Sequence, residues 1–336
     1  MRRILILALV MGLAIFGLIY AEISLSEVTA AFSKAGWGIA LVFLARIVVT
    51  FLLALAWHWL FPKETRPALH ICVKIRIVRD AINALLPVAQ VGGDVVGARL
   101  VSLQSHAPAM AAASVVTDVF LQIVTQFVFT LVALALLIRH GGGDLIATNV
   151  MGGMMVVAPA LLALFLIQRR DFGAILLSVL KRLAGDRALG ATDAFYAALA
   201  VVQARRRAMT ASGVVHLLAW ILGSLEVWFA FQFMGYPIGI AEALMIEALG
   251  HAIRGAAFAI PGAIGVQEAG LVILSGIFGI PPEPALAMSL IKRVADLAIG
   301  LPGLMLWHQM ETGAVVQSGK PDETLLPIPQ KDTHLH

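Results

Sequence analysis

The sequence contains few charged residues and almost no cysteine. Only 13% of its 336 residues are Asp, Glu, Lys or Arg, whereas 60% are hydrophobic and the mean hydropathy is +0.92. An ordinary soluble domain carries roughly 25% charged residues. The one cysteine, Cys72, excludes an intrachain disulfide. This composition excludes a soluble globular domain and indicates a protein that buries its apolar surface in lipid.

The sequence also lacks the residue patterns of common catalytic and metal sites. Its nine His residues are scattered, and no Cys or His cluster has the spacing of a zinc site. There is no usable Ser-His-Asp arrangement and no phosphate-binding glycine loop with its lysine. We therefore predict a protein that is not an enzyme and uses neither metal, cofactor nor nucleic acid. Acid and base chemistry by Asp and Glu residues keeps a lipid-modifying enzyme as an alternative.

Six apolar runs are long enough to cross about 30 Å of hydrocarbon as helices. The first resembles a signal peptide, but Ile19 would occupy a cleavage position that needs a small residue, so we predict a retained helix. The six runs are Ile4–Ala21, Trp37–Leu60, Pro108–Ile138, Val150–Ile167, Ser212–Met234 and Ala285–Trp307.

Two further segments, Pro67–Ser105 and Ile240–Gly279, are interrupted by matching motifs. Pro87-Val-Ala-Gln-Val-Gly-Gly-Asp94 recurs 174 residues later as Pro261-Gly-Ala-Ile-Gly-Val-Gln-Glu268. Each motif has a helix-breaking Pro, an Ala two residues later and a carboxylate seven residues after the Pro. Because a broken apolar segment is tolerated in a membrane only where protein or water surrounds it, we interpret each as a re-entrant helix hairpin. Chance similarity is the alternative, since Pro, Gly and Ala are common in membrane helices.

The same offset relates whole segments of the chain. Residues 37–138 and 211–308 form two repeat units, with residues 139–210 as their connector. We predict an all-α polytopic membrane protein with six full crossings and two re-entrant hairpins. Residues 1–311 form a single membrane domain, followed by a disordered cytoplasmic tail, 312–336. Counting each hairpin as two full crossings would give ten crossings and the same orientation.

The distribution of basic residues predicts the orientation. Only Lys34 and Arg139 are placed outside, whereas most of the 24 Lys and Arg residues fall on the other side, which is therefore cytoplasmic. Both termini are then cytoplasmic, in a bacterial inner membrane. The first unit enters from outside and the second from the cytoplasm, which makes the duplication an inverted repeat. The cytoplasmic residues are Arg2, Arg3, Lys63, Arg66, Lys74, Arg76, Arg79, the eight basic residues of 169–207, Lys320 and Lys331.

Polar residues form four stripes at helical spacing on these apolar segments. Such stripes cannot all face lipid, so we expect them to face one another or water. The alternative is that they only hold the helices together, with Lys292 and Arg293 paired locally to Asp296. The stripes are Arg76, Arg79, Asp80 and Asn83; Glu247, Gly250, His251 and Arg254; Ser114, Asp118, Gln122, Thr125 and Gln126; and Ser289, Lys292, Arg293, Asp296, Gly300 and Gly303.

Two carboxylates stand where a helix restarts after each break. Asp94 and Glu268 lie in the expected first turns of these helices, where unpaired N–H groups carry partial positive charge. Each carboxylate could cap its own helix. Each could instead bind a substrate group or exchange a proton, and the two roles are compatible.

Three motifs resemble the flippase-like membrane family, which includes the transmembrane part of lysyl-phosphatidylglycerol synthase. They are Pro261–Glu268, Arg293-x-x-Asp296 and the run from Arg79 to Arg99. The sequence of these motifs is most similar to the hopanoid-biosynthesis-associated, HpnL-type branch. The resemblance covers residues 4 to 310 and implies paired re-entrant helices in an inverted repeat. Thr117-Asp118 departs from relatives that carry a basic residue before the acid.

The resemblance implies movement of a lipid headgroup across the bilayer, with a link to hopanoids. The membrane partners expected are hopanoids or anionic phospholipids, together with proteins of hopanoid synthesis. The sequence lacks an aminoacyl transferase domain, so lysyl transfer is not expected. A small-solute or ion carrier and a component of hopanoid synthesis remain alternatives. The predicted substrate-binding and translocation residues are Arg79, Asp80, Asn83, Pro87, Asp94, Arg99, Asp118, Gln122, Glu247, Arg254, Pro261, Glu268, Lys292, Arg293 and Asp296.

Overall fold

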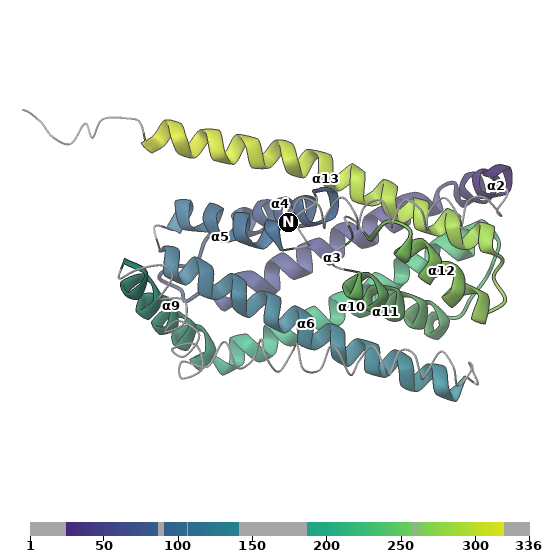
Figure 1. Ribbon diagram of the computed structural model, residues 1–336, viewed down its shortest axis with the longest axis horizontal. Helices are drawn as coiled ribbons and strands as arrows, with labels where there is room; N and C mark the ends of the chain where they lie inside the picture. The colour runs from purple at the N-terminus through teal and green to yellow at the C-terminus, as the bar shows by residue number, and fades with distance from the viewer. Residues whose placement is uncertain are drawn as a thin grey trace, which may run out of the picture.

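A computed structural model describes residues 25–86, 91–105, 107–140, 187–257, 260 and 263–318, and this part of the chain contains ten α-helices and no strand (Figure 1). The predicted crossings Ile4–Ala21 and Val150–Ile167 lie outside the described residues, as do Pro87 and Pro261. The helices are α2 (Leu25–Ala35), α3 (Gly38–Leu60), α4 (Leu69–Leu85), α5 (Gly92–Ser105), α6 (Pro108–Arg139), α9 (Arg187–Ala204), α10 (Arg206–Met234), α11 (Ile240–Ala256), α12 (Val266–Ile277) and α13 (Pro282–Ser318).

The helix boundaries follow the offset of 174 residues found in the sequence. Helix α5 begins at Gly92 and α12 at Val266, while α6 begins at Pro108 and α13 at Pro282. The ends of α3 and α10 are related by the same offset. Proline suits the first position of a helix because its missing N–H would have no helical partner there. Helices α3–α6 and α10–α13 are therefore equivalent sets of four.

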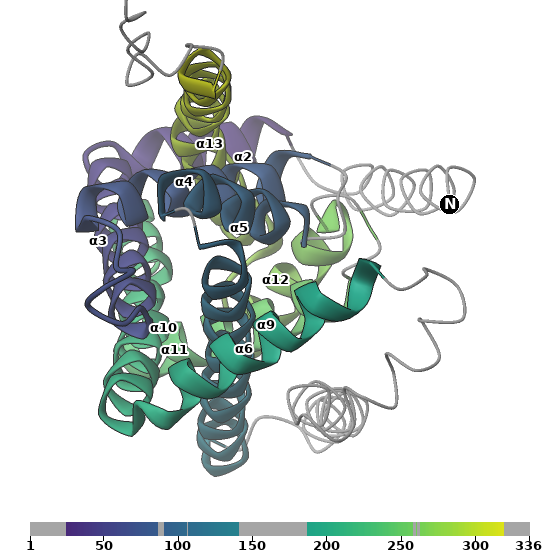
Figure 2. The same ribbon diagram turned by 90° about the vertical axis from the view of Figure 1, so that its left-hand side faces the viewer.

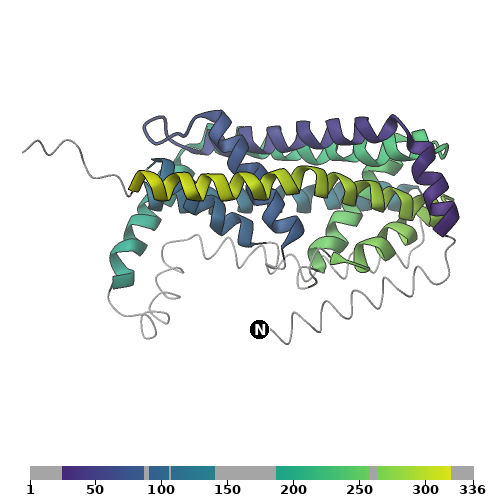
Figure 3. The same ribbon diagram turned by 90° about the horizontal axis from the view of Figure 1, so that it is seen from above.

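The first helices of the two sets are antiparallel and lie side by side. Gly38 at the start of α3 packs so closely on Phe233 near the end of α10 that a β-carbon would clash with that ring. At the other end, Arg205, just before α10, donates to the carbonyl oxygens of Trp59 and Leu60 at 3.1 and 2.9 Å. Figure 3 shows α3 and α10 together along one side of the molecule. The two sets thus enter the bundle from opposite ends.

The short helices of each set occupy opposite ends of the bundle (Figure 1). Helices α4 and α5 pack in an apolar core with Trp57, Ile75 and Leu199, whereas α11 and α12 pack in a second core with Phe231 and Ile291. Figure 2 shows α9 lying obliquely across the end that holds α4 and α5. The four short helices contain 17, 14, 17 and 12 residues. At about 1.5 Å per residue, none reaches the roughly 30 Å of a bilayer core.

Three described helices are long and apolar enough to cross a membrane: α3, α6 and α10. Their outer faces carry exposed apolar side chains such as Leu44, Leu131 and Leu218, as expected of a surface in contact with lipid. Helix α13 covers the sixth predicted run, but Lys292, Arg293 and Asp296 interrupt its apolar sequence. These helices have the character of a membrane protein, with exposed apolar side chains on their outer faces and a group of charged side chains in the interior.

Helix α13 extends into the predicted C-terminal tail. It has 37 residues and continues to Ser318. The Thr312 hydroxyl donates to the carbonyl oxygen of His308 at 2.9 Å, and no proline interrupts the helix there. Residues 319–336 lie outside the described part of the chain.

Glycine allows α5 to approach α4 closely. A β-carbon at Gly93 would lie 2.2 Å from the carbonyl oxygen of Arg79 and 2.9 Å from Cγ of Asn83. A β-carbon at Gly97, one turn later, would meet the Arg79 side chain at 2.6 Å. Because the first obstacle is backbone, no side-chain rotation can make room at Gly93. The glycines in this motif therefore set the distance between the two short helices.

Substituting Gly93 by Ala is expected to destabilise the protein by about 1–3 kcal/mol through overpacking. The control is Gly276→Ala in α12, where no described atom lies within 4 Å of the new methyl group. That change should be neutral or should stabilise by up to about 1 kcal/mol, since Ala favours a helix over Gly. Thermal unfolding in detergent measures both variants. An equal midpoint for Gly93→Ala and wild type would contradict the close packing.

Candidate functional site

The charged residues of the polar stripes gather in two interior groups. The first group, here the Asp118 cluster, joins three helices of the first set to α10. In it Asp118 of the α6 stripe faces Arg76 and Arg79 of the α4 stripe, with the start of α5 beside them. Its members are Arg76, Arg79, Asp80, Asn83, Asp94, Asp118 and His216.

Arg79 is the most connected member of the Asp118 cluster. Its side chain is 1% exposed, and its Nε and Nη2 donate to Oδ1 of Asp94 at 2.9 and 2.7 Å. Nη2 also lies 2.8 Å from Oδ2 of Asp118. The guanidinium carbon sits 4.8 Å from the ring centre of Trp57, a cation–π distance. Arg79 thus links the starts of α5 and α6 to α4 and α3.

Asp118 lies at the centre of this cluster and is fully buried. Besides Arg79, it faces Nη1 of Arg76 at 3.5 Å and Nε2 of His216 at 3.3 Å. Neither Asp118 oxygen receives a well-directed hydrogen bond from a described residue, so its stabilisation is mainly coulombic. The other ring nitrogen of His216 lies 2.9 Å from the carbonyl oxygen of Ser212. A buried carboxylate is tolerated here because two guanidinium groups surround it.

Asp94 forms an ion pair, while the Asn83 side chain of α4 hydrogen-bonds to the start of α5, the helix that contains Asp94. Oδ1 of Asn83 accepts the backbone N–H of Gly93 at 2.8 Å, and the Asn83 amide lies 3.4 Å from Oδ2 of Asp94. An N–H group at the start of α5 is therefore satisfied by a side chain of α4. This leaves the Asp94 carboxylate to Arg79, in agreement with a role other than capping.

The second group, here the Lys292 cluster, joins four helices of the second set and the long helix α3. It contains the charged residues of the predicted stripes of α11 and α13, which face each other, whereas Gly300 and Gly303 of the α13 stripe pack against α4. Its members are Arg46, Glu226, Glu247, His251, Arg254, Glu268, Lys292, Arg293 and Asp296.

Arg46 connects the two sets of helices inside the Lys292 cluster. It forms a two-pronged pair with Glu226 of α10, with Nε–Oε1 at 2.7 Å and Nη2–Oε2 at 2.6 Å. Its Nη1 also contacts Asp296 of α13. Asp296 in turn lies 3.7 Å from Arg254 of α11. One arginine from the first set is thus held by two carboxylates of the second.

Lys292 occupies the centre of its cluster, as Asp118 does in the other. Its side chain is 7% exposed, and Nζ lies 2.5 Å from Oε2 of Glu247 and 3.7 Å from Oε2 of Glu226. The second oxygen of Glu247 lies 3.0 Å from Nε2 of His251. The local pairing with Asp296 that the sequence suggested is not formed, because each charged residue here has a partner on another helix. The network therefore fixes α13 against α10 and α11.

Glu268 both caps its helix and pairs with a cation. Oε2 accepts the backbone N–H of Gly265 at 2.7 Å and completes a capping box. Oε1 accepts from Nε and Nη2 of Arg293 at 3.1 and 3.0 Å and from the Ser289 hydroxyl at 3.3 Å. Gly265 has φ 82°, a left-handed conformation that suits glycine, and precedes α12 directly. Glu268 therefore caps α12 and forms an ion pair with Arg293 at the same time.

The repeat-related positions of the two clusters carry both equal and opposite charges. Asp94 and Glu268 are related by the offset of 174 and are both acidic partners of an arginine. Asp118 and Lys292 are related by the same offset but differ in sign, and each faces groups of the opposite charge. The acid at each helix start is thus common to both units, whereas the central residue is not.

Two predicted residues lie outside both clusters. Arg99 is 62% exposed and forms a two-pronged pair with Glu311 near the end of α13, at 2.9 and 3.2 Å. Gln122 is half-buried, and no hydrogen bond joins its side chain to another described residue. Pro87 and Pro261 were placed at the breaks, which lie beyond the described ranges. The cavity expected between these breaks would be lined by the same residues, so it also lies outside the described part of the chain.

Three residues of the clusters were not among those predicted from the sequence. Arg46, His216 and Glu226 stand alone on apolar helices, so no stripe drew attention to them. Each is nonetheless an ionisable group inside a long apolar run, which is itself a signal of an interior position. Among the described residues, no group of three His, Cys, Asp or Glu side chains could hold a metal ion.

One comparison with known proteins identified a family. Residues 4–303 match the family described as the lysylphosphatidylglycerol synthase TM region, which is nearly the whole chain. No curated protein and no solved structure matches the chain. With apolar outer faces and charged interior groups, the helices have the character of a membrane protein. The chain belongs to the family of the lysylphosphatidylglycerol synthase transmembrane region.

Proposed function

We propose that this protein moves a lipid headgroup across a bacterial cytoplasmic membrane, between its two sets of helices. The observation that carries the proposal is the matched pair of acids, Asp94 and Glu268. Each begins the second short helix of its set and is held by an arginine in an otherwise apolar bundle. Charged groups are costly in a membrane interior, and such groups commonly mark a path for polar cargo.

The architecture proposed with this function is an inverted repeat of two re-entrant hairpins among six crossings. The antiparallel contact of α3 with α10 supports it, and so does the placement of the short helix pairs at opposite ends (Figure 1). Each hairpin then enters from a different side of the bilayer. Such opposed units are a recurrent way to expose one site alternately to the two sides.

Both termini are proposed to be cytoplasmic. The end of the bundle where α3 stops and α10 starts carries Lys63, Arg66 and Arg205–Arg207, whereas Lys34 and Arg139 belong to helices that end on the other side. This asymmetry is the one that orients membrane proteins. Labelling single cysteines at positions 34 and 207 with an impermeant reagent tests it, because only position 34 should react from outside.

The lipid proposed is linked to hopanoids, in a process without catalysis by this chain. The support is the resemblance of the run from Arg79 to Arg99 to the hopanoid-associated branch. In the structure this run forms much of the Asp118 cluster, so the most branch-specific sequence coincides with an interior charged site. Intact recovery of the added lipid after an assay tests the absence of catalysis.

Glu268→Gln and Asp94→Asn are expected to leave accumulation normal and to slow lipid movement by roughly tenfold, about 1.4 kcal/mol. In Asp94→Asn the amide oxygen can still accept from Arg79. In Glu268→Gln the single amide oxygen can accept either from the Gly265 N–H or from Arg293, so this variant loses the charge and one set of hydrogen bonds. The measurement is the rate at which fluorescent hopanoid or phospholipid becomes accessible to a quencher in proteoliposomes.

The matched control is Glu311→Gln, which also removes an arginine-bound carboxylate but lies outside both clusters. It should retain the wild-type rate. Full activity in both Glu268→Gln and Asp94→Asn would reject the proposed site. A wild-type rate equal to that of protein-free liposomes, for every lipid tried, would reject lipid movement itself. Failure of both variants to accumulate would show that the acids serve only to hold the helices together.

A further inference from the structure

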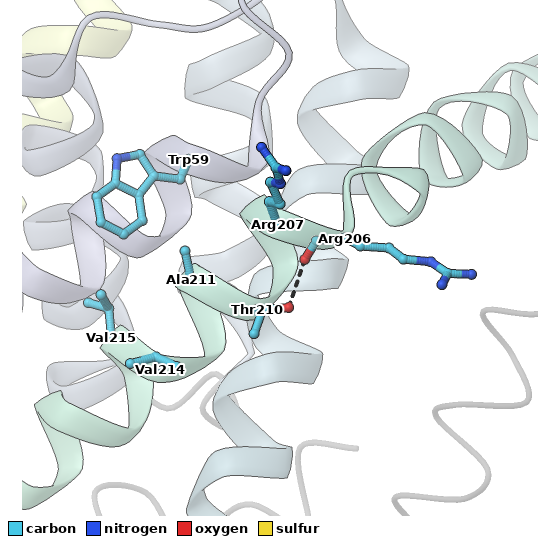
Figure 4. A pocket seen from close by; sticks show the side chains of 7 residues that line it. All are labelled: Trp59, Arg206, Arg207, Thr210, Ala211, Val214 and Val215. Atoms are coloured by element: carbon cyan, nitrogen blue, oxygen red, sulfur yellow. Dashed lines mark hydrogen bonds between the residues drawn. The ribbon is translucent and has the colours of Figure 1, made fainter.

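A surface hollow of about 580 Å³ lies where α3 ends and α10 begins, away from both charged clusters. Figure 4 shows the Trp59 ring facing the first turns of α10, with the two arginine side chains leaving that helix on different sides. None of its lining residues belongs to the proposed translocation site. They are Trp59, Arg206, Arg207, Thr210, Ala211, Val214 and Val215.

The three consecutive arginines at this place have different roles. Arg205 forms hydrogen bonds within the protein, because it donates to the carbonyl oxygens at the end of α3. Arg206 and Arg207 are exposed, and neither forms an ion pair with a described carboxylate. The nearby loop carries Glu64, but Lys63 and Arg66 outweigh its charge. Two guanidinium groups therefore have no carboxylate partner in the described part of the chain and can meet an anion from outside.

The hollow lies at the ends of two candidate membrane spans, where lipid headgroups are expected. Helices α3 and α10 are both candidate spans, and the hollow is formed by the last turn of one and the first turns of the other. Tryptophan and arginine are characteristic of this boundary. Below it, Val214, Leu218 and Ile221 are exposed at 53%, 47% and 40% and follow one face of α10. The hollow is thus continuous with a row of exposed apolar side chains along α10.

We propose that this hollow binds one anionic phospholipid of the adjoining leaflet. Arg207 contacts its phosphate, since a guanidinium group can donate two parallel hydrogen bonds to phosphate oxygens, and Arg206, which leaves the helix on another side, adds positive charge at the same level (Figure 4). The acyl chains lie along Val214, Leu218 and Ile221. The Thr210 hydroxyl already donates to the carbonyl oxygen of Arg206 at 2.8 Å (Figure 4), so the arginines supply the recognition. A zwitterionic lipid is bound less well, because its own cation opposes the arginines.

This site goes beyond the proposed lipid movement, because it binds a lipid without moving it. The lipid would sit against the junction of α3 and α10, the first helices of the two sets. Its binding can be measured on protein that performs no transport, so the two proposals can fail separately.

The test is quenching of Trp59 fluorescence by brominated lipids in nanodiscs. The Trp59 contribution is the difference between wild type and Trp59→Phe. Brominated phosphatidylglycerol is expected to quench it more than brominated phosphatidylcholine at equal mole fraction. The double variant R206Q/R207Q should weaken this preference by about tenfold, and R206K/R207K should keep part of it.

The control for general surface charge is K63Q/K74Q, which removes two exposed positive charges without altering the lining of the hollow. It should keep the wild-type preference. Equal quenching by the two lipids in wild-type protein would overturn the site. An equal loss of preference in R206Q/R207Q and K63Q/K74Q would overturn it too, since that result means diffuse attraction to the membrane surface.

Discussion

Asp118→Asn is expected to lower the stability of the protein by about 3–5 kcal/mol. The substitution leaves Arg76 and Arg79, which are almost completely buried, without the carboxylate between them. Asp94 still faces Arg79, but it approaches from α5 and cannot reach the place that Asp118 fills on α6. The cost comes from uncompensated buried charge rather than from the loss of one contact.

A thermal unfolding midpoint in detergent, followed by a fluorescent C-terminal fusion, measures this effect. A decrease of roughly 5–15 °C corresponds to the expected loss for a chain of this size. Asp80→Asn is the matched control, because Asp80 belongs to the same cluster and pairs with Arg76 at 3.0 Å but is 34% exposed. Its effect should stay within about 1 kcal/mol. Similar midpoints for Asp118→Asn and Asp80→Asn would show that the central carboxylate is not special.

Lys292→Met is expected to have a comparable effect through the opposite charge. It leaves Glu247 buried with only His251 beside it and removes the second cation from Glu226. The methionine side chain fills a similar volume, so packing is largely kept. We again expect a loss of about 3–5 kcal/mol.

The double variant Lys292→Met/Glu247→Gln separates charge from packing. Removing both members of a buried pair costs much less than removing one, so the double variant should be more stable than Lys292→Met alone. Unfolding midpoints of the two single variants and the double variant give the coupling between the two residues. If the two single effects simply add, the 2.5 Å contact between Lys292 and Glu247 does not contribute as the structure indicates.

Much of the fold could be predicted because the residues that end and start its helices act locally. Prolines and glycines mark helix ends directly, and the motif that recurs after 174 residues predicted a helix start near Glu268, where α12 begins. Helix α13 begins at Pro282, before the start predicted at Ala285. The length of α13 could not be predicted in the same way. Residues 312–318 include Gly313 and precede a tail that contains proline and charged residues, so composition gave no helical signal there. In the structure α13 continues through them to Ser318.

The candidate site was only partly predictable, for a different reason. Helical spacing shows which residues share a face, so the stripes containing Arg79 and Lys292 were found. Spacing does not show which distant helix a face meets. Hence the pairing of Asp296 with Arg46 and Arg254, rather than with its neighbours in α13, required the structure. The charge count likewise placed Arg76 at the cytoplasmic side, whereas burial among carboxylates gives it an interior role.

The position of Arg46 has a consequence for how the chain is made. Its partners Glu226 and Asp296 follow it by 180 and 250 residues, so both are still unsynthesised when α3 leaves the ribosome. An arginine in the middle of a lone apolar helix costs about 2.5–3.5 kcal/mol at insertion. The surrounding apolar residues of α3 can meet that cost, but the charge stays uncompensated until α10 and then α13 arrive. The charge on Arg46 is therefore neutralised only after α10 and α13 have been inserted. Helix α3 must remain in the membrane, or beside the translocation machinery, until then.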